Sequence, residues 1–257
     1  MDPEATPTHP GKLRALMSPL NHLPFCRSLL WISALIAALL ALAPCAQATV
    51  KIEGTRLIYF GQYKEASINI VNQSSSELAV QSWVTREDDD ATSPVPFAVV
   101  QPLVRLDAQQ HHLLRILYAG AGLPSDVESM FLLNVMEIPL KPEAADSVQF
   151  AVRQRLKLFY RPAGLAGSSS EAVPQLVWSR TDGQTLTVTN PSAFHLSLVD
   201  VQVDKGGQVQ VLDDYLLLKP GERKVFSTQA PISVGSQINF TEITDIGLQA
   251  RHRAVLK

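Results

Sequence analysis

From residue 56 onward, hydrophobic and polar residues alternate with a period of two along most of the chain. The alternating segments are short, rich in β-branched and aromatic residues, and separated by turn residues: RLIYF, EASINIVN, LAVQSWV, LLRILY, MFLLNVMEI and FAVRQRLKLFY. No stretch shows helical periodicity over several turns. Because strands that bury one face alternate in this way, we predict roughly six or seven strands in an all-β sandwich.

The alternation is interrupted at residues 163–174 by the small and polar sequence AGLAGSSSEAVP, a composition typical of a linker between domains. Strand patterns then resume in LVWS, TLTVTNP, FHLSLVDVQV, RKVFS and QINFTEIT, with TDG and KPGE as turns. We therefore predict an all-β protein with an N-terminal domain over residues 49–163, a linker over 164–174 and a second, slightly smaller β-domain over 175–257.

Residues 1–48 follow a different pattern. They contain the three parts of a secretory signal peptide, namely cations, a short apolar core and small residues before the cleavage point: Arg14 and Arg27, residues 29–42, and Ala46 and Ala48. We expect cleavage to make Thr49 the first residue of the mature chain. An uncleaved membrane anchor is the alternative, and Met17 is an alternative start of the leader.

Charge and cysteine content narrow the function classes further. A formal net charge of -2 gives no general attraction to nucleic acid or acidic membranes. Both cysteines, Cys26 and Cys45, lie in the leader, so the mature chain would enter an oxidising compartment without a disulfide. Cys45 does not make a good lipidation site, because Pro44 stands where a small residue should precede it.

Residue patterns that carry enzymatic chemistry are sparse. The predicted mature chain has no cysteine nucleophile, no glycine-rich phosphate loop and no GxSxG elbow. His111 and His112 are adjacent and would point to opposite faces of a strand, while His195 and His252 are isolated. The acidic run at residues 87–90 lacks the alternating ligands of a calcium loop and is interpreted as a solvated turn. We expect no metal, no cofactor and no enzymatic activity, and these features favour binding.

The segment DSVQFAVRQRLKLFYRP, residues 146–162, combines an apolar stripe with a block of charge. Its alternating apolar residues fall on one face of an extended strand, and three cations follow downstream: Val148, Phe150 and Val152, then Arg153, Arg155 and Lys157. The alternation shows only that one face is suited to burial. That face could belong to the core of its own domain, or it could be offered to another protein.

Several segments resemble, in order and spacing, the periplasmic pilus-assembly chaperones of the chaperone/usher pathway, the PapD-like family. They are GTRLIYFGQYKEASINIVN with QSWV, LPSDVESMFLLNVMEIP and RLKLFYRPAGL, followed in the second domain by VTNPSAFHLSLVDV and INFTEITDIG. The resemblance covers nearly all of residues 49–257. It implies two immunoglobulin-like domains in a boomerang arrangement, with a subunit-binding cleft between them, and a location in the periplasm of a Gram-negative bacterium.

The resemblance also implies a mechanism. Such chaperones bind a pilin or fimbrial subunit that lacks its last strand, lend it a strand of their own, and deliver it to an outer-membrane usher without a nucleotide. Matched to the family motifs, Arg56 and Lys157 would anchor the C-terminal carboxylate of the subunit. Val148, Phe150 and Val152 would be the alternating apolar residues of the lent strand.

A third set, Glu128, Arg161 and Asp245, matches the salt bridges that hold the two domains at their working angle in this family. The sequence departs from the family at Val127, where an arginine is common, and at Ile246, where an aromatic residue is usual. The short segment between Pro139 and Val148 resembles the branch of the family with a short loop, which serves rod-like pili.

Two other classes remain open at this point. One is a secreted β-sandwich adhesin or fimbrial subunit, although the absence of cysteines from the predicted mature chain argues against it. The other is a hydrolase on an immunoglobulin-like scaffold. Without the family resemblance, Arg56 and Lys157 would be interpreted as ordinary solvated cations, and Glu128, Arg161 and Asp245 as independent surface charges.

Overall fold

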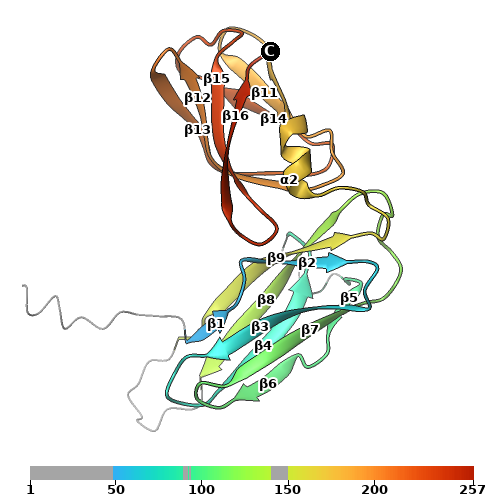
Figure 1. The fold of residues 1–257 in the computed structure, drawn as a ribbon. Helices are drawn as coiled ribbons and strands as arrows, with labels where there is room; N and C mark the ends of the chain where they lie inside the picture. The colour runs from blue at the N-terminus through green and yellow to red at the C-terminus, as the bar shows by residue number, and fades with distance from the viewer. Residues whose placement is uncertain (1–48, 89–91, 93, 140–149) are drawn as a thin grey trace, which may run out of the picture. The chain divides into compact units, whose positions relative to one another are not determined.

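The computed structural model describes residues 49–88, 92, 94–139 and 150–257 (Figure 1). The described residues all belong to one compact unit. The expected signal peptide therefore lies outside the described residues. In the part of the chain that is described, no helix combines the length and apolar character that a membrane crossing requires.

Two sheets build the first β-domain. Their strand orders are β1-β3-β7-β5 and β2-β9-β8-β4-β6. Neighbouring strands pair antiparallel, apart from β2 and β9, which are parallel. The strands are β1 (Val50–Ile52), β2 (Arg56–Phe60), β3 (Glu65–Asn72), β4 (Leu78–Thr85), β5 (Phe97–Val99), β6 (Leu103–Leu106), β7 (His111–Tyr118), β8 (Ser129–Pro139) and β9 (Arg153–Arg161).

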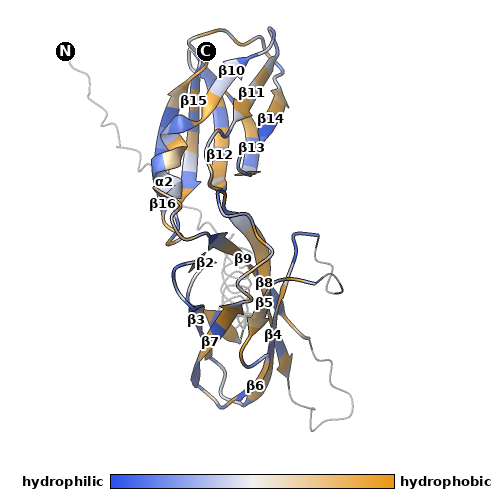
Figure 2. Ribbon diagram, turned by 90° about the vertical axis from the view of Figure 1, so that its right-hand side faces the viewer, coloured by the Kyte–Doolittle hydropathy of each residue, from blue (hydrophilic) through white to orange (hydrophobic). Residues whose placement is uncertain are grey.

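Alternating burial explains why these segments form strands. On β2, Leu57 and Tyr59 are buried, whereas the residues between and beside them are half-buried or exposed. Tyr59 joins an aromatic cluster in the core, in which the Tyr118 and Tyr160 ring centroids are 4.4 Å apart. In Figure 2, hydrophobic and hydrophilic colours succeed one another along the strands.

The second domain is also a two-sheet sandwich, with strand orders β10-β11-β14 and β13-β12-β15-β16. Its core surrounds the buried Trp178, whose ring lies 5.7 Å from that of Phe240. The predicted all-β class with two β-domains is confirmed. The strands are β10 (Val177–Arg180), β11 (Thr185–Thr189), β12 (Leu196–Lys205), β13 (Gln208–Leu218), β14 (Arg223–Ser227), β15 (Gln237–Ile243) and β16 (Gln249–Val255).

The segment expected to be a linker contains a single helical turn, α2 (Ser169–Ala172), followed by the 3-10 turn η1 (Val173–Gln175). The Ser168 hydroxyl accepts a hydrogen bond from the backbone N–H of Glu171 and so caps α2. Ala172 and Val173 are buried in the core of the second domain. A helix of this length is too short to show a helical period in the sequence.

Candidate functional site

The parallel pairing of β2 with β9 sets Arg56 directly opposite Lys157. The next residues along the two strands, Leu57 and Leu158, are paired as well and are buried in the core. Register partners project from the same face of a sheet, so the side chains of Arg56 and Lys157 lie side by side on one face. Both side chains are half-buried. Two strands that are far apart in the sequence therefore hold two positive charges together on a rigid support.

Burial and the positive charge of Arg56 lower the pKa of Lys157 to about 8, although Glu87 opposes the change. The Lys157 Nζ lies 4.3 Å from the centroid of the Tyr215 ring, in a cation–π contact with a residue of β13. The lysine therefore remains mostly charged at neutral pH, but a second cation so close raises the cost of that charge. An anion at this place would relieve it.

Arg56 has only part of its hydrogen-bonding capacity satisfied. Its Nη1 donates to the backbone carbonyl of Ile243 at 2.8 Å, and its Cζ lies 5.9 Å from the Phe159 ring centroid. Its Nε is buried and has no hydrogen-bond partner among the described residues. Burial lowers the pKa of the guanidinium, whereas the nearby carboxylates of Asp245, Glu128 and Glu242 oppose that change. The guanidinium as a whole is half-buried, so its accessible N–H groups can bind a carboxylate.

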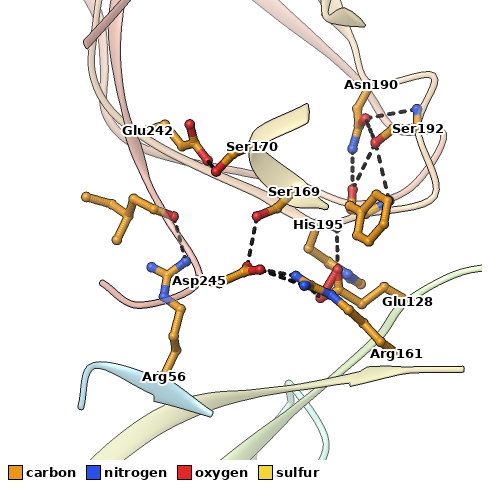
Figure 3. Close-up of polar contacts among 12 residues, drawn as sticks. Arg56, Glu128, Arg161, Ser169, Ser170, Asn190, Ser192, His195, Glu242 and Asp245 are labelled. Atoms are coloured by element: carbon orange, nitrogen blue, oxygen red, sulfur yellow. Dashed lines mark hydrogen bonds and ion pairs between the residues drawn. The ribbon is translucent and has the colours of Figure 1, made fainter. Parts of the chain in front are cut away.

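Arg161, Asp245 and Glu128, the three residues of the expected salt-bridge set, lie together (Figure 3). Arg161 is the centre of the group: its Nη1 and Nη2 donate to the two oxygens of Asp245 at 2.6 and 2.7 Å. Glu128 Oε1 is 3.8 Å from Arg161 Nη2. Ser169 of α2 donates its hydroxyl to Asp245 at 2.8 Å. In Figure 3, Asp245 lies between Arg56 and Arg161.

The group is tied to both β-domains. Glu128, just before β8, donates its backbone N–H to the carbonyl of Ala193 at 2.9 Å, and its Oε2 accepts from the backbone N–H of His195 at 3.2 Å. The Arg161 guanidinium lies 5.0 Å from the Phe194 ring centroid. Arg161 from the first domain is thus enclosed by residues of the second.

Burial changes the protonation of two members of this region. It raises the pKa of Glu128 to about 7, although the positive charge of Arg161 and the hydrogen bond from His195 oppose the change. It lowers the pKa of His195 to about 4, and Lys219, Lys157 and Arg161 add to that effect. In Arg161, burial lowers the pKa, but the hydrogen bond with Asp245 and the charge of Glu128 outweigh it and raise the pKa overall.

Sequence reasoning did not find Ser169 or His195 as part of this group. Ser169 lies in the segment that was interpreted as a linker, and His195 takes part through its backbone N–H, which any residue could supply. Asn190, in the motif TNPS, gives a clearer signal. Its Nδ2 donates to the carbonyl of Phe194 at 2.7 Å, and its Oδ1 accepts from Ser192, which shapes the turn next to Arg161.

The expected lent strand is described in part. Val148 lies outside the described residues. Phe150 is 77% exposed and Val152 is 38% exposed, and neither belongs to the core of the first domain. The carbonyl of Val152 accepts from the backbone N–H of Glu137 at 2.9 Å, so the pairing with β8 continues to this point.

β9 begins before its pairing with β2. β2 pairs with β9 only from Lys157 to Arg161, whereas β8 pairs with β9 from Arg153 to Tyr160.

Among the described residues, no group of His, Cys, Asp and Glu side chains could hold a metal ion.

Comparisons with known proteins agree with this arrangement. Residues 49–166 match the family described as "Pili and flagellar-assembly chaperone, PapD N-terminal domain", and residues 171–254 match "Pili assembly chaperone PapD, C-terminal domain". The probable fimbrial chaperone YadV of Escherichia coli (strain K12) is 38% identical over 178 residues, which are 65% of this chain and 72% of that protein.

Solved structures give the same result. The crystal structure of the YadV chaperone aligns with a TM-score of 0.70 at 31% identity and covers 81% of this chain and 100% of its own. The SafB chaperone, solved in complex with the Salmonella enterica SafA pilin, aligns at 0.69 and 29% identity over 83% and 99% of the two chains. The periplasmic chaperone SfaE aligns at 0.65 and 27% identity over 81% and 100%.

The two family matches together cover most of the chain and coincide with its two β-sandwiches. Both domains are therefore immunoglobulin-like. The chain belongs to the PapD-like family of pilus-assembly chaperones.

Proposed function

We propose that this protein is a periplasmic chaperone that holds pilus or fimbrial subunits by donor-strand complementation and delivers them to an outer-membrane usher. The observation that carries the proposal is the register of β2 with β9, which sets Arg56 opposite Lys157 on one face of the sheet. Family membership, and the SafB relative solved with a pilin, support pilins as the class of partner.

Arg56 and Lys157 would anchor the C-terminal carboxylate of the subunit. Two cations on paired strands can bind one carboxylate through charge-assisted hydrogen bonds, and little side-chain motion is needed. The half-buried guanidinium of Arg56 and the ammonium of Lys157 are suitable donors. Because a fixed terminus sets the register of the strand that follows it, the anchor also decides which side chains meet which pockets.

The lent strand would comprise Val148, Phe150 and Val152 and continue into β9. The part of β9 that precedes its pairing with β2 would add to an edge strand of the subunit, in the manner of β-augmentation. The exposed side chains of Phe150 and Val152 are free to enter a groove of the subunit. Burial of each should contribute about 1.5–3 kcal/mol before ordering costs.

Glu128, Arg161 and Asp245 would have a structural role: they would fix the second domain relative to the strands that bind the subunit. The short distance in sequence between β8 and the lent strand supports the branch of the family with a short loop. The leader and the periplasmic location of the relative SfaE support export.

The test is co-expression with a pilin, followed by affinity purification of the chaperone. The double variant Arg56→Ala, Lys157→Ala should lose most of the co-purified pilin because the carboxylate loses both donors. The matched control is Arg223→Ala, Lys224→Ala, which removes two exposed cations from β14 and should retain the pilin. Retention of pilin by the first variant at the level of the control would contradict the anchor, provided that circular dichroism shows both proteins folded.

A further inference from the structure

Glu137 is a buried acid in the first domain with an incompletely satisfied carboxylate. It lies on β8 and is 8% exposed. Its Oε1 accepts a hydrogen bond from the Thr49 hydroxyl, whereas its Oε2 is buried and has no hydrogen-bond partner among the described residues. A buried carboxylate oxygen without a donor is costly, because its lost hydration is not replaced.

The position of Thr49 beside this carboxylate is fixed by its neighbours in the chain. The Thr49 carbonyl accepts from the backbone N–H of Gln73 at 2.7 Å, and Val50, which follows, is buried in β1. The backbone is therefore fixed on both sides of the Thr49 side chain. In threonine, the backbone nitrogen is only three bonds from Oγ1, so it stays within a few ångströms of the group that Oγ1 contacts.

The sequence predicts that the leader is cleaved between Ala48 and Thr49. Hydrolysis of that peptide bond consumes one water, leaves a carboxylate on Ala48 and converts the Thr49 nitrogen from a neutral amide into an ammonium group. We propose that this new α-ammonium forms an ion pair with Glu137 Oε2, so that removal of the leader completes a buried site in the first domain.

The pair would lie at the base of the lent strand. The backbone N–H of Glu137 donates to Val152, and Gln154 Nε2 on β9 donates to the carbonyl of Val50 on β1 at 2.7 Å. The mature N-terminus is thereby connected to both strands that support residues 150–152. Processing thus stabilises this region in the exported chain and not in the precursor. The inference goes beyond the proposed function and can be tested without a pilin.

The first experiment measures the pKa of the α-amino group by NMR in protein purified after export. Intact mass should show Thr49 as the first residue. The pKa of its ammonium should exceed the ordinary value of about 7.7–8.0 by about one unit or more, and Glu137→Gln should return it to the ordinary range. The control Thr49→Val, which removes the hydroxyl but keeps the amine, should preserve the raised pKa.

The second experiment remains informative if Glu137→Gln folds poorly. An alanine inserted between Ala48 and Thr49 leaves the leader unchanged and displaces the ammonium by one residue. This insertion should lower Tm by about 2–4 °C near neutral pH. The loss should shrink as pH rises through the raised pKa, because the ammonium of the parent is then neutral.

Three results would overturn the proposal. The first is a processed chain that begins elsewhere than Thr49. The second is an α-amino pKa in the ordinary range in the parent protein. The third is an unchanged Tm after the alanine insertion. Retention of pilin by the Arg56 and Lys157 double variant, which would contradict the proposed anchor, would leave each of these measurements unaffected, so the two proposals fail independently.

Discussion

Glu128→Gln tests whether burial raises the pKa of an acid that lies in the first domain and contacts the second. Glu128 is 3% exposed, and burial raises its pKa from 4.5 to about 7 even though Arg161 is close by. The folded protein therefore binds this proton more tightly than the unfolded chain. The stability that this difference contributes is fully present below pH 4.5 and is lost as the pH rises through 7.

The size of the effect follows from the shift in pKa. At about 1.4 kcal/mol per pKa unit, the rise in the pKa of Glu128 corresponds to about 3 kcal/mol of unfolding free energy. Glutamine has nearly the same shape, can still accept from the N–H of His195 and does not titrate. The parent should therefore lose about 3 kcal/mol of unfolding free energy relative to Glu128→Gln between pH 4.5 and pH 8.

The assay is urea unfolding of both proteins across this pH range, analysed by linear extrapolation with the slope m checked for constancy. The shifted pKa values of Asp245 and His195 contribute in both proteins and largely cancel in the difference. If the two stability curves run parallel from pH 4.5 to pH 8, Glu128 does not titrate near neutral pH, and the reasoning from burial is refuted.

Three further predictions concern the other charged and close contacts. Arg161→Met should lower the unfolding free energy measured in urea by about 3–5 kcal/mol because the acids beside it lose their cation. Arg105→Met, which removes an exposed ion pair, should change the unfolding free energy little. Equal losses in the two variants would contradict the argument from burial. Gly247 has φ of +81°, and a Cβ there would lie 2.5 Å from a neighbouring threonine oxygen, whereas Gly122 has φ of +93° and open space around it. Gly247→Ala should therefore lower Tm more than Gly122→Ala. Equal losses would exclude the close contact as the cause. Pilin affinity should fall by up to about tenfold per pH unit above pH 8 as Lys157 loses its proton, and Lys157→Arg should remove this dependence in a binding titration.

Some of the site could be predicted from the sequence because the relevant signals are local. The segment FAVRQRLKLFY predicts a strand, and β9 occupies most of it. Arg56 and Lys157 are a different case. They are about a hundred positions apart, and nothing in either segment says that β2 and β9 are parallel neighbours. In the sequence, only the resemblance to the PapD-like family relates Arg56 to Lys157, whereas the structure pairs the two residues directly.

The buried charges were the least predictable part. Glu137 occurs in NVMEIP as an ordinary strand residue, and its burial depends on how β1 packs against β8 and β9. The contribution of His195 is a backbone N–H, which leaves no trace in residue identity. The α2 turn was missed because four residues cannot establish a period, although its Ser169 completes the hydrogen bonds of Asp245.

The amino-acid sequence was sufficient to establish the all-β class and the presence of two β-domains, and it predicts the leader of an exported protein. Each rests on a pattern within about ten to twenty residues: alternation for a strand, small polar residues for a break, and an apolar core between cations and small residues for a leader. The three-dimensional fold was needed to establish which strands are neighbours, in which register they pair and which charged side chains are removed from water. Strand register and burial depend on residues far apart in the chain, and the pKa values of Lys157 and Glu128 follow from that burial.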